Sequence, residues 1–471
     1  MRRRCRVVVV GGGLSGLTAA YRLQSRFGSL VEIVLLEASA RLGGHLRTER
    51  PADGWLAECG PDAFIRTKPA GVQLCRDLGI EHELIRPERA HQQAYIATQT
   101  GWAAVPDDFH LLVPRRFESL LTTPLLSTGA KLRAIREREI ASTGAVDPSL
   151  ADFTRERWGD EMLTRLVQPL AAGIYSADPE RLSLRATMPR FLQLVDEYGS
   201  LTAAGRHERT DAKASGARYD LFASFPAGIA RLIEALDGAT EPVDKRLGTS
   251  VRAVKQDNAS WVVRTDTGSL AADAVCLATP AAVAARLLSS VRAVAECPLP
   301  TITAASSTVV VGGYRRDQFS HPLDAFGFVI PHVLGEAATA ISIASNKFPG
   351  RAPRGHVLVR TFLGSPSFDA EAASDADCRK VAADVLSRRL GKSGEPLFTL
   401  VVPYRDASPL YEIGHASRVR AVDRAIESLP GLALAGASYT GVGIPDAIAS
   451  ATAAASSIAV WLEGSRVAGT R

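Results

Sequence analysis

A glycine-rich turn between a strand-like segment and a helix-like segment constrains this chain more than any other feature. The β-branched segment 6–10 runs into Gly11-Gly12-Gly13-Leu14-Ser15-Gly16, which has the spacing G-x-G-x-x-G. Apolar residues recur at helical spacing over 14–27, and a second apolar strand over 31–36 ends at Glu37. A strand, turn, helix, strand and acidic residue in this order predict a βαβ unit that binds a dinucleotide.

Each position in this unit has a physical reason. Gly11 permits the tight turn, Gly13 lets the backbone approach a pyrophosphate, and Gly16 allows close contact between helix and strand. The N-terminus of the following helix attracts phosphate charge. Glu37 can accept hydrogen bonds from ribose hydroxyls, which favours FAD or NAD over NADP.

The segment after Glu37 distinguishes between these dinucleotides. Arg41-Leu42-Gly43-Gly44-x-x-Arg47-Thr48 resembles the double-glycine signature of the flavin amine oxidase superfamily, which NAD enzymes do not carry. Paired glycines let the backbone approach a ligand, and an arginine offsets phosphate charge. FAD is therefore the expected cofactor. The resemblance also implies non-covalent binding, because no cysteine follows Cys378 to make the covalent link found in some amine oxidases.

Composition is typical of a globular enzyme and excludes several other classes. The chain has 471 residues, 46% of them hydrophobic and 22% charged, with a net charge of +5. Basic residues are scattered among acidic ones, so nucleic acid is not an expected partner. The six cysteines lie far apart without a CxxC pair, which suggests neither a disulfide framework nor a metal site.

Five further motifs narrow the resemblance. Glu58-Cys59-Gly60-Pro61-Asp62-Ala63-Phe64 looks like the E-x-G-P-[DN]-x-F segment of the oxygen-dependent porphyrinogen oxidases. Segments 169–175, 326–331 and 436–446 and the motif Tyr411-x-x-Gly414-His415 agree with that family in order. The last glycine-rich segment, 436–446, resembles the bacterial coproporphyrinogen branch most closely. The chain departs from the family pattern at Ser176-Ala177 and at 407–410, which weakens detailed inference about the substrate.

The resemblance implies a set of site residues. Lys68 matches a basic position that would pair with a substrate propionate, and Gly173 matches a glycine whose backbone lies close to the macrocycle. Tyr404 stands where relatives often have Trp beside the flavin. No catalytic side chain is expected beyond the flavin itself. The implied FAD-binding residues are Gly11, Gly12, Gly13, Leu14, Ser15, Gly16, Glu37, Ala38, Arg41, Gly44, Gly60, Pro61, Asp62, Ala63, Val251, Tyr404, Gly436, Val442, Gly443 and Ile444.

The pattern along the chain predicts an α/β fold with α+β insertions. We expect a discontinuous Rossmann-like FAD-binding domain made from residues 1–89, 218–290 and 413–471, a helical insertion over 90–217, and a substrate-binding mixed-sheet domain over 291–412. Within these, 199–217 is expected to include a loop. Segments 260–265 and 274–278 are expected to flank a hairpin turn, and 447–462 to form a packed helix rather than a membrane span.

The function implied by the resemblance is oxidation of coproporphyrinogen III to coproporphyrin III in haem biosynthesis, with FAD as cofactor, oxygen as acceptor and hydrogen peroxide as by-product. Three alternatives stay open. The first is oxidation of protoporphyrinogen IX to protoporphyrin IX, and the second is a flavin amine oxidase. The third is a non-catalytic carrier on the same fold.

Partners and location are also open. A ferrochelatase is a candidate acceptor of the product. We expect a cytoplasmic protein and keep peripheral contact with the inner face of the cell membrane as an alternative. Segments 109–113 and 120–121 either belong to the core or give an apolar surface for that contact.

Overall fold

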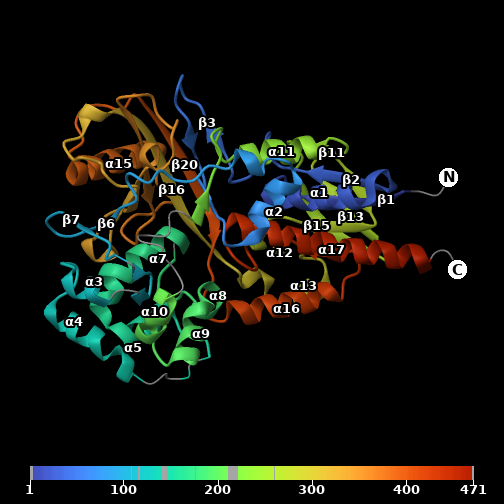
Figure 1. Cartoon of the computed structure of the whole chain (residues 1–471). Coiled ribbons are helices and arrows are strands. Elements are labelled where there is room, and N and C mark those ends of the chain that lie inside the picture. The colour runs from blue at the N-terminus through green and yellow to red at the C-terminus, as the bar shows by residue number, and fades with distance from the viewer. Residues whose placement is uncertain are drawn as a thin grey trace.

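The computed structural model describes residues 4–107, 109–114, 117–140, 144, 146–175, 177–210, 221–258 and 260–468. Figure 1 shows one region built around a sheet near both termini, a second region with another sheet, and a group of helices beside that second sheet. The long strands β16 (Ala304–Arg315) and β20 (Phe398–Pro409) belong to the second sheet. The predicted α/β fold with inserted elements is confirmed.

The sheet near the termini is parallel and has the strand order β11-β2-β1-β15-β21. Val10 at the end of β1 lies opposite Leu36 on one side and Leu277 on the other. The carboxyl ends of these strands therefore meet at one edge, where the glycine turn begins. The strands are β1 (Cys5–Val10), β2 (Val31–Leu36), β11 (Asp244–Arg246), β15 (Ala274–Leu277) and β21 (Leu432–Leu434).

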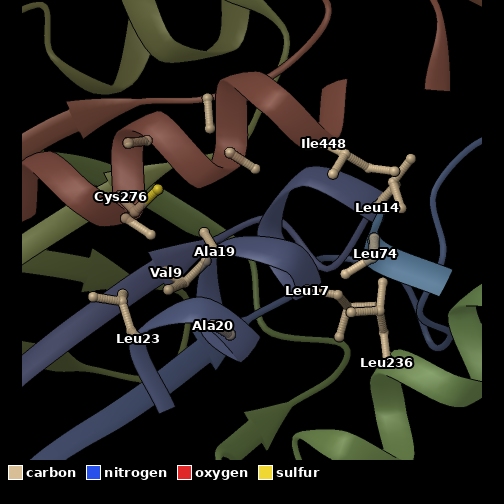
Figure 2. Close-up of a cluster of buried hydrophobic side chains, with 14 of the residues drawn as sticks. Val9, Leu14, Leu17, Ala19, Ala20, Leu23, Leu74, Leu236, Cys276 and Ile448 are labelled. Carbon is tan, nitrogen blue, oxygen red and sulfur yellow. The ribbon is translucent and has the colours of Figure 1, made fainter. Parts of the chain in front are cut away.

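Four helices cover one face of this sheet through a continuous hydrophobic cluster. They are α1 (Leu14–Phe27), α2 (Pro69–Asp77), α11 (Arg231–Ala239) and α17 (Ile444–Ala468). Figure 2 shows side chains from β1, from these helices and from β15 gathered around α1. The labelled members of the cluster are Val9, Leu14, Leu17, Ala19, Ala20, Leu23, Leu74, Leu236, Cys276 and Ile448.

Helix α17 is the one helix among the described residues that is long and apolar enough to cross a membrane, over Ile444–Ser465 with a mean hydropathy of 1.2. Its buried residues recur at helical spacing, from Ile448 and Ala451 to Ile458 and Leu462. They pack in the cluster around α1. The expected packed C-terminal helix is therefore confirmed as a core helix.

The opposite face of the parallel sheet packs on an antiparallel sheet and a second group of helices. That sheet consists of β12 (Val251–Asp257), β13 (Ser260–Thr265) and β14 (Ser269–Ala272). The expected hairpin was partly wrong. β13 pairs across the Thr267-Gly268 turn with β14, whereas 274–277 is β15 of the parallel sheet. The helices are α12 (Ala281–Leu287), α13 (Arg292–Ala295) and α16 (His415–Glu427).

The second large sheet has seven strands in the order β20-β16-β19-β18-β17-β6-β7. Its other strands are β19 (His356–Leu363), β18 (Ala338–Ile343), β17 (Gly327–Val329), β6 (Ala94–Ala97) and β7 (Trp102–Ala104). Helices α14 (Ala344–Lys347) and α15 (Asp375–Leu390) accompany it. Helical character was expected from residue 90 onward, but 94–104 form strands because β6 pairs in parallel with β17.

The helical region begins at Phe117 and surrounds its own hydrophobic cluster. Phe109, Leu112, Val113 and Leu120 are buried in this cluster, so the two apolar segments are mainly core rather than membrane surface. Its elements are α3 (Phe117–Thr122), α4 (Thr128–Ile135), η3 (Arg136–Glu139), α5 (Leu150–Trp158), α6 (Asp160–Met162), η4 (Leu163–Val167), α7 (Gln168–Tyr175), α8 (Leu184–Thr187), α9 (Pro189–Tyr198) and α10 (Leu201–Thr210).

The loop expected within 199–217 stays a prediction, because only part of that segment is described. Residues 201–210 form helix α10, and 211–217 lie outside the described residues. The remaining elements are short and join the larger ones. They are β3 (Thr48–Glu49), β4 (Ala57–Glu58), β5 (Phe64–Ile65), β8 (Phe109–His110), β9 (Val113–Pro114), β10 (Phe222–Ala223), η1 (Gly28–Leu30), η2 (Glu81–Glu83), η6 (Leu299–Thr301), η7 (Arg316–Gln318) and η8 (His332–Leu334).

Candidate functional site

The turn between β1 and α1 requires glycine at two positions. Gly11 has φ +104°, and a Cβ there would lie 2.6 Å from the carbonyl oxygen of Ala278. A Cβ on Gly16 would lie 1.8 Å from the carbonyl oxygen of Gly11. Any larger residue would push the helix away from the strand, so the turn is shaped to bring the N-terminus of α1 to the sheet edge.

Glu37 shapes this turn from the end of β2. Its Oε2 accepts a hydrogen bond from the Gly12 N–H at 2.6 Å, and its Oε1 accepts one from the Ser39 N–H at 2.8 Å. A carboxylate has about four acceptor positions, so these bonds leave capacity for ribose hydroxyls. The Glu37 carbonyl also accepts from the Thr249 N–H at 2.8 Å, which brings the segment before β12 to the same place.

The second glycine pair packs directly on the first turn. Gly43 donates its N–H to the Gly12 carbonyl at 2.9 Å, and a Cβ on Gly44 would lie 3.2 Å from the Gly13 Cα. The Arg41 guanidinium donates to the Gly44 carbonyl at 2.6 Å, and its side chain is exposed. The double-glycine segment therefore closes one side of the dinucleotide turn.

The C-terminal glycine loop, residues 436–443, reaches the same edge of the sheet from the other end of the chain. It follows β21, which pairs in parallel with β15, and it leads into α17. The N–H groups at the start of a helix carry positive partial charge. Val442, Gly443 and Ile444 thus present the positive end of α17, which suits negative charge on a reduced flavin.

One cavity of about 690 Å³ joins the two glycine-rich ends. This volume lies in the range of small-molecule and cofactor sites. Glu37 and Val251 line it together with Val442 and Ile444, although these pairs come from opposite ends of the sequence. The implied FAD-binding residues in its lining are Gly11, Gly13, Leu14, Ser15, Glu37, Ala38, Gly44, Pro61, Val251, Gly436, Val442, Gly443 and Ile444.

The cavity fits FAD by the hydrogen-bonding groups that surround it. Backbone N–H groups at the start of α1 suit the pyrophosphate, and the Glu37 carboxylate suits a ribose. His45 also lines the cavity. Burial, with Arg41 nearby, lowers the pKa of His45, so its imidazole is neutral near pH 7.

Several implied FAD-binding residues lie outside this lining. Gly12 donates to Glu37 and Gly16 packs on the Gly11 carbonyl, so both contact the turn itself. The Arg41 side chain bonds to the backbone of its own segment. Ala63 adjoins Asp62 in a half-buried position. Gly60 packs against the His45 carbonyl oxygen, which a Cβ would approach to 1.9 Å.

Two of these residues have polar partners of their own. Burial raises the pKa of Tyr404 to about 12, and its hydroxyl donates to the Cys59 carbonyl at 2.8 Å. Asp62 forms an ion pair with Lys347, whose Nζ lies 2.9 Å from Oδ1.

The two expected substrate contacts have different surroundings. The Lys68 ammonium lies 2.7 Å from both carboxylate oxygens of Asp446 in the first turn of α17, and 53% of its side chain is exposed. Gly173 is exposed in α7, and a Cβ built on it meets no atom within 4 Å. Lys68 is thus already paired with a carboxylate directly after the C-terminal glycine loop. The open space around Gly173 leaves room for a ligand.

The sequence did not identify a third side of the cavity. Residues 278–283 line it because they follow β15, whose carboxyl end lies beside that of β1. The apolar strand-like segment before residue 278 is a signal in the sequence that could have identified them, because ligands bind at the carboxyl ends of parallel strands. The other lining residues that were missed have no local motif, and they include Thr249, Ser250, Arg252, Arg286, Leu287, Pro300, Ile302, Thr303, Ala304, Asp406, Ala407 and Pro409.

Comparison with known proteins agrees with this geometry. The family of flavin-containing amine oxidoreductases matches residues 14–459. A coproporphyrinogen III oxidase of Bacillus subtilis is 31% identical over 466 residues, which cover 97% of this chain and 98% of that protein. The enzyme of the same name from Staphylococcus aureus is 28% identical and covers 96% of this chain and 98% of its own length.

Solved structures give the same result. A protein of Exiguobacterium sp. 255-15 with the provisional name protoporphyrinogen oxidase has a TM-score of 0.86 and 30% identity, covering 98% of this chain and 99% of its own. Cyclohexylamine oxidase of Brevibacterium oxydans has a TM-score of 0.69 at 17% identity, covers 98% of this chain and 100% of its own, and shares the fold. The chain therefore belongs to the flavin-containing amine oxidoreductase family, groups with porphyrinogen oxidases in it, and uses FAD as its cofactor.

Proposed function

We propose that this enzyme oxidises coproporphyrinogen III to coproporphyrin III, with oxygen as the electron acceptor. The observation that carries the proposal is one cavity joining both glycine-rich ends, in a chain similar over nearly its full length to relatives named coproporphyrinogen III oxidase. When bound, FAD accepts a hydride from a saturated meso carbon and passes the electrons to oxygen, which gives hydrogen peroxide. Three such two-electron rounds in total, each with loss of a proton from the macrocycle as well as the hydride, convert a porphyrinogen to a porphyrin.

The chain contributes binding and orientation to this reaction. The turn 11–16, the double-glycine segment and the C-terminal glycine loop hold the cofactor along the sheet edge. We assign Gly173 to the face of the macrocycle, because its exposed position in α7 leaves space that the packing of the chain does not fill. We assign Lys68 to a propionate, which would share its ammonium with Asp446.

A second candidate substrate is protoporphyrinogen IX. The Exiguobacterium protein and a protoporphyrinogen oxidase of Arabidopsis thaliana, 26% identical, carry names that refer to it. An amine substrate has less support, because the cyclohexylamine and putrescine oxidases among the solved structures are 15% to 17% identical. A non-catalytic carrier is set aside, because the chain belongs to a family of oxidoreductases.

Anaerobic bleaching of the flavin absorbance tests the proposal. The FAD-loaded protein is mixed without oxygen with coproporphyrinogen III, protoporphyrinogen IX or cyclohexylamine, and the rate of bleaching is recorded. We expect the fastest bleaching with coproporphyrinogen III, followed after admission of oxygen by porphyrin fluorescence and peroxide. Faster bleaching with protoporphyrinogen IX would support the second candidate, and bleaching by the amine alone would contradict both.

We also propose that the enzyme acts in the cytoplasm. Support comes from the burial of Phe109, Leu112, Val113 and Leu120 in the core of the helical region. Flotation with vesicles of anionic and neutral lipid tests peripheral membrane contact. Recovery of the protein with either vesicle would favour the inner face of the membrane.

A further inference from the structure

The C-terminal glycine loop, residues 436–443, has an irregular backbone that faces the cofactor cavity. Gly436 and Gly441 have φ +130° and +125°, a region that favours glycine. Gly436, Ala437, Ser438, Val442 and Gly443 line the cavity. Because most of this irregular segment is half-buried and has no strand or helix partners, its less exposed backbone polar groups need hydrogen bonds from elsewhere.

A single hydroxyl supplies two of these bonds. The Tyr411 Oη donates to the Ala437 carbonyl at 2.6 Å and accepts from the Gly441 N–H at 2.5 Å. A phenol can donate and accept at once, so it closes residues 437–441 into a fixed turn. Tyr411 is 1% exposed, lies outside the cavity lining and packs in the hydrophobic cluster of the helical region.

His415 extends this support to the tip of the loop. Its ring stacks on Tyr411, with ring centres 4.0 Å apart and an angle of 13° between the planes. Burial lowers the pKa of His415, so the ring is neutral. Its Nε2 lies 3.0 Å from the Tyr439 carbonyl, which can only accept, so Nε2 carries the proton and donates.

The two ends of the loop have their own partners. Gly436 donates its N–H to the Ser450 Oγ at 3.0 Å, and Gly443 donates to Asp446 Oδ2 at 3.2 Å. Asp446 is in turn paired with Lys68. Side chains thus hold the loop at its start, middle and end, and Tyr411 holds the widest span.

The backbone of Tyr411 is fixed by the helical region. Its carbonyl accepts from the Ser183 N–H at 2.8 Å. Asp147 accepts from the Ser183 hydroxyl and, at 2.7 Å, from the Gly414 N–H. Tyr411 therefore connects the C-terminal glycine loop with the helical region, which contains Gly173 in α7.

We propose that Tyr411 is a positioning residue whose phenol sets the shape of the C-terminal glycine loop, so that the N–H groups at the start of α17 face the flavin. His415 supports it through the stacked ring and the bond to the Tyr439 carbonyl. The proposal depends on FAD occupying the cavity and does not depend on which substrate the enzyme oxidises.

Two tyrosine variants form the test, because they remove hydroxyls that differ in their bonding. Tyr411→Phe deletes the hydroxyl with two loop bonds. Tyr439 lies within the same loop. Tyr439→Phe deletes a buried hydroxyl that has no hydrogen-bond partner among the described residues. FAD dissociation constants, flavin midpoint potentials at saturating FAD and melting temperatures of the apoproteins are measured for both.

We expect Tyr411→Phe to raise the FAD dissociation constant about tenfold, because a carbonyl and an N–H in half-buried positions lose their partner. We also expect its flavin midpoint potential to fall, since displaced N–H groups stabilise the reduced form less. Tyr439→Phe should stay within about twofold of the wild type. A structural defect alone would lower the melting temperature of the apoprotein without moving the potential at saturating FAD.

Either of two results with the tyrosine variants would overturn the proposal. One is a Tyr411→Phe protein with wild-type FAD affinity and potential, and the other is an equal loss in Tyr439→Phe. If Tyr411→Phe does not fold, His415→Phe takes its place, because it keeps the stacked ring and removes the bond to Tyr439. We expect about a threefold rise in the FAD dissociation constant for that variant, and an unchanged value would also overturn the proposal. None of these readouts requires a porphyrinogen, so they stand apart from the test of the substrate.

Discussion

At the scale of single residues, this chain uses glycine for two different reasons. A Cβ on Gly60 would lie 1.9 Å from the His45 carbonyl oxygen, so the packing of the chain itself excludes a side chain there. A Cβ on Gly173 would meet no atom within 4 Å. Glycine inside a helix lowers stability relative to alanine, and the fold does not require glycine at 173, which agrees with the proposed contact to the macrocycle.

Alanine substitutions separate these two roles. Gly60→Ala should displace segment 58–62, lower the free energy of unfolding by about 1–3 kcal/mol and weaken FAD binding. Gly173→Ala should raise that free energy by about 0.5–1 kcal/mol and leave FAD binding unchanged, while the KM for coproporphyrinogen III rises severalfold. Urea unfolding, FAD titration and steady-state kinetics measure these effects. An unchanged KM in Gly173→Ala would place the macrocycle elsewhere.

At the scale of elements, a buried ion pair holds the helical region together. Glu137 in η3 and Arg157 in α5 are 0% and 1% exposed, and their charged groups lie 3.0 Å apart. Glu137 also accepts hydrogen bonds from the N–H groups of Leu201 and Thr202, at 2.9 and 3.0 Å. One carboxylate therefore connects three elements and caps the start of α10.

Removing this charge should destabilise the helical region strongly. We expect Glu137→Gln to lower the free energy of unfolding by about 3–5 kcal/mol, because Arg157 is left as an uncompensated buried charge. Glu180→Gln breaks an exposed ion pair with Arg155 and should change the free energy of unfolding by at most about 1 kcal/mol. Urea unfolding and limited proteolysis of the two variants make the comparison. Equal losses of free energy of unfolding in the two variants would mean that the buried ion pair stabilises the helical region no more than the exposed pair does.

At the scale of the whole molecule, Asp62 links the two sheets. Its segment approaches the cofactor cavity through Pro61, while Lys347 and Arg360 come from α14 and β19 beside and within the seven-stranded sheet. Lys347 Nζ lies 2.9 Å from Oδ1, and an Arg360 nitrogen lies 3.3 Å from Oδ2. Burial alone would raise the pKa of Asp62, but these two cations hold it below its usual value.

This link should be sensitive to acid. Because the folded-state pKa of Asp62 is below its unfolded-state value, the carboxylate stabilises the fold above about pH 4, and this contribution is lost as pH falls through the folded-state pKa. We therefore expect Asp62→Asn to have a lower melting temperature than the wild type at pH 7. The difference should narrow below about pH 4, as measured by calorimetry. A constant difference across this range would contradict the assignment.

Local patterns in the sequence predicted the region around the parallel sheet well. The limits of α1 and β2 agree with the segments 14–27 and 31–36, because apolar spacing and a glycine turn act over a few residues. β20 was missed because Pro403, Pro409 and a polar stretch interrupt its pattern, and it forms through pairing with β16. Helix α10 was not predicted, and its start is capped by a carboxylate more than sixty residues away in the sequence.

The sequence by itself determined the class of cofactor and the fold that holds it, because backbone geometry at a glycine turn and the acid after β2 depend on adjacent residues. Only the tertiary structure decided which distant segments complete the cavity, that Lys68 pairs with Asp446, and that Tyr411 holds the C-terminal glycine loop. These contacts join positions hundreds of residues apart or lie in irregular backbone. Such contacts follow from how sheets and helices pack in space, which no local pattern of residues encodes.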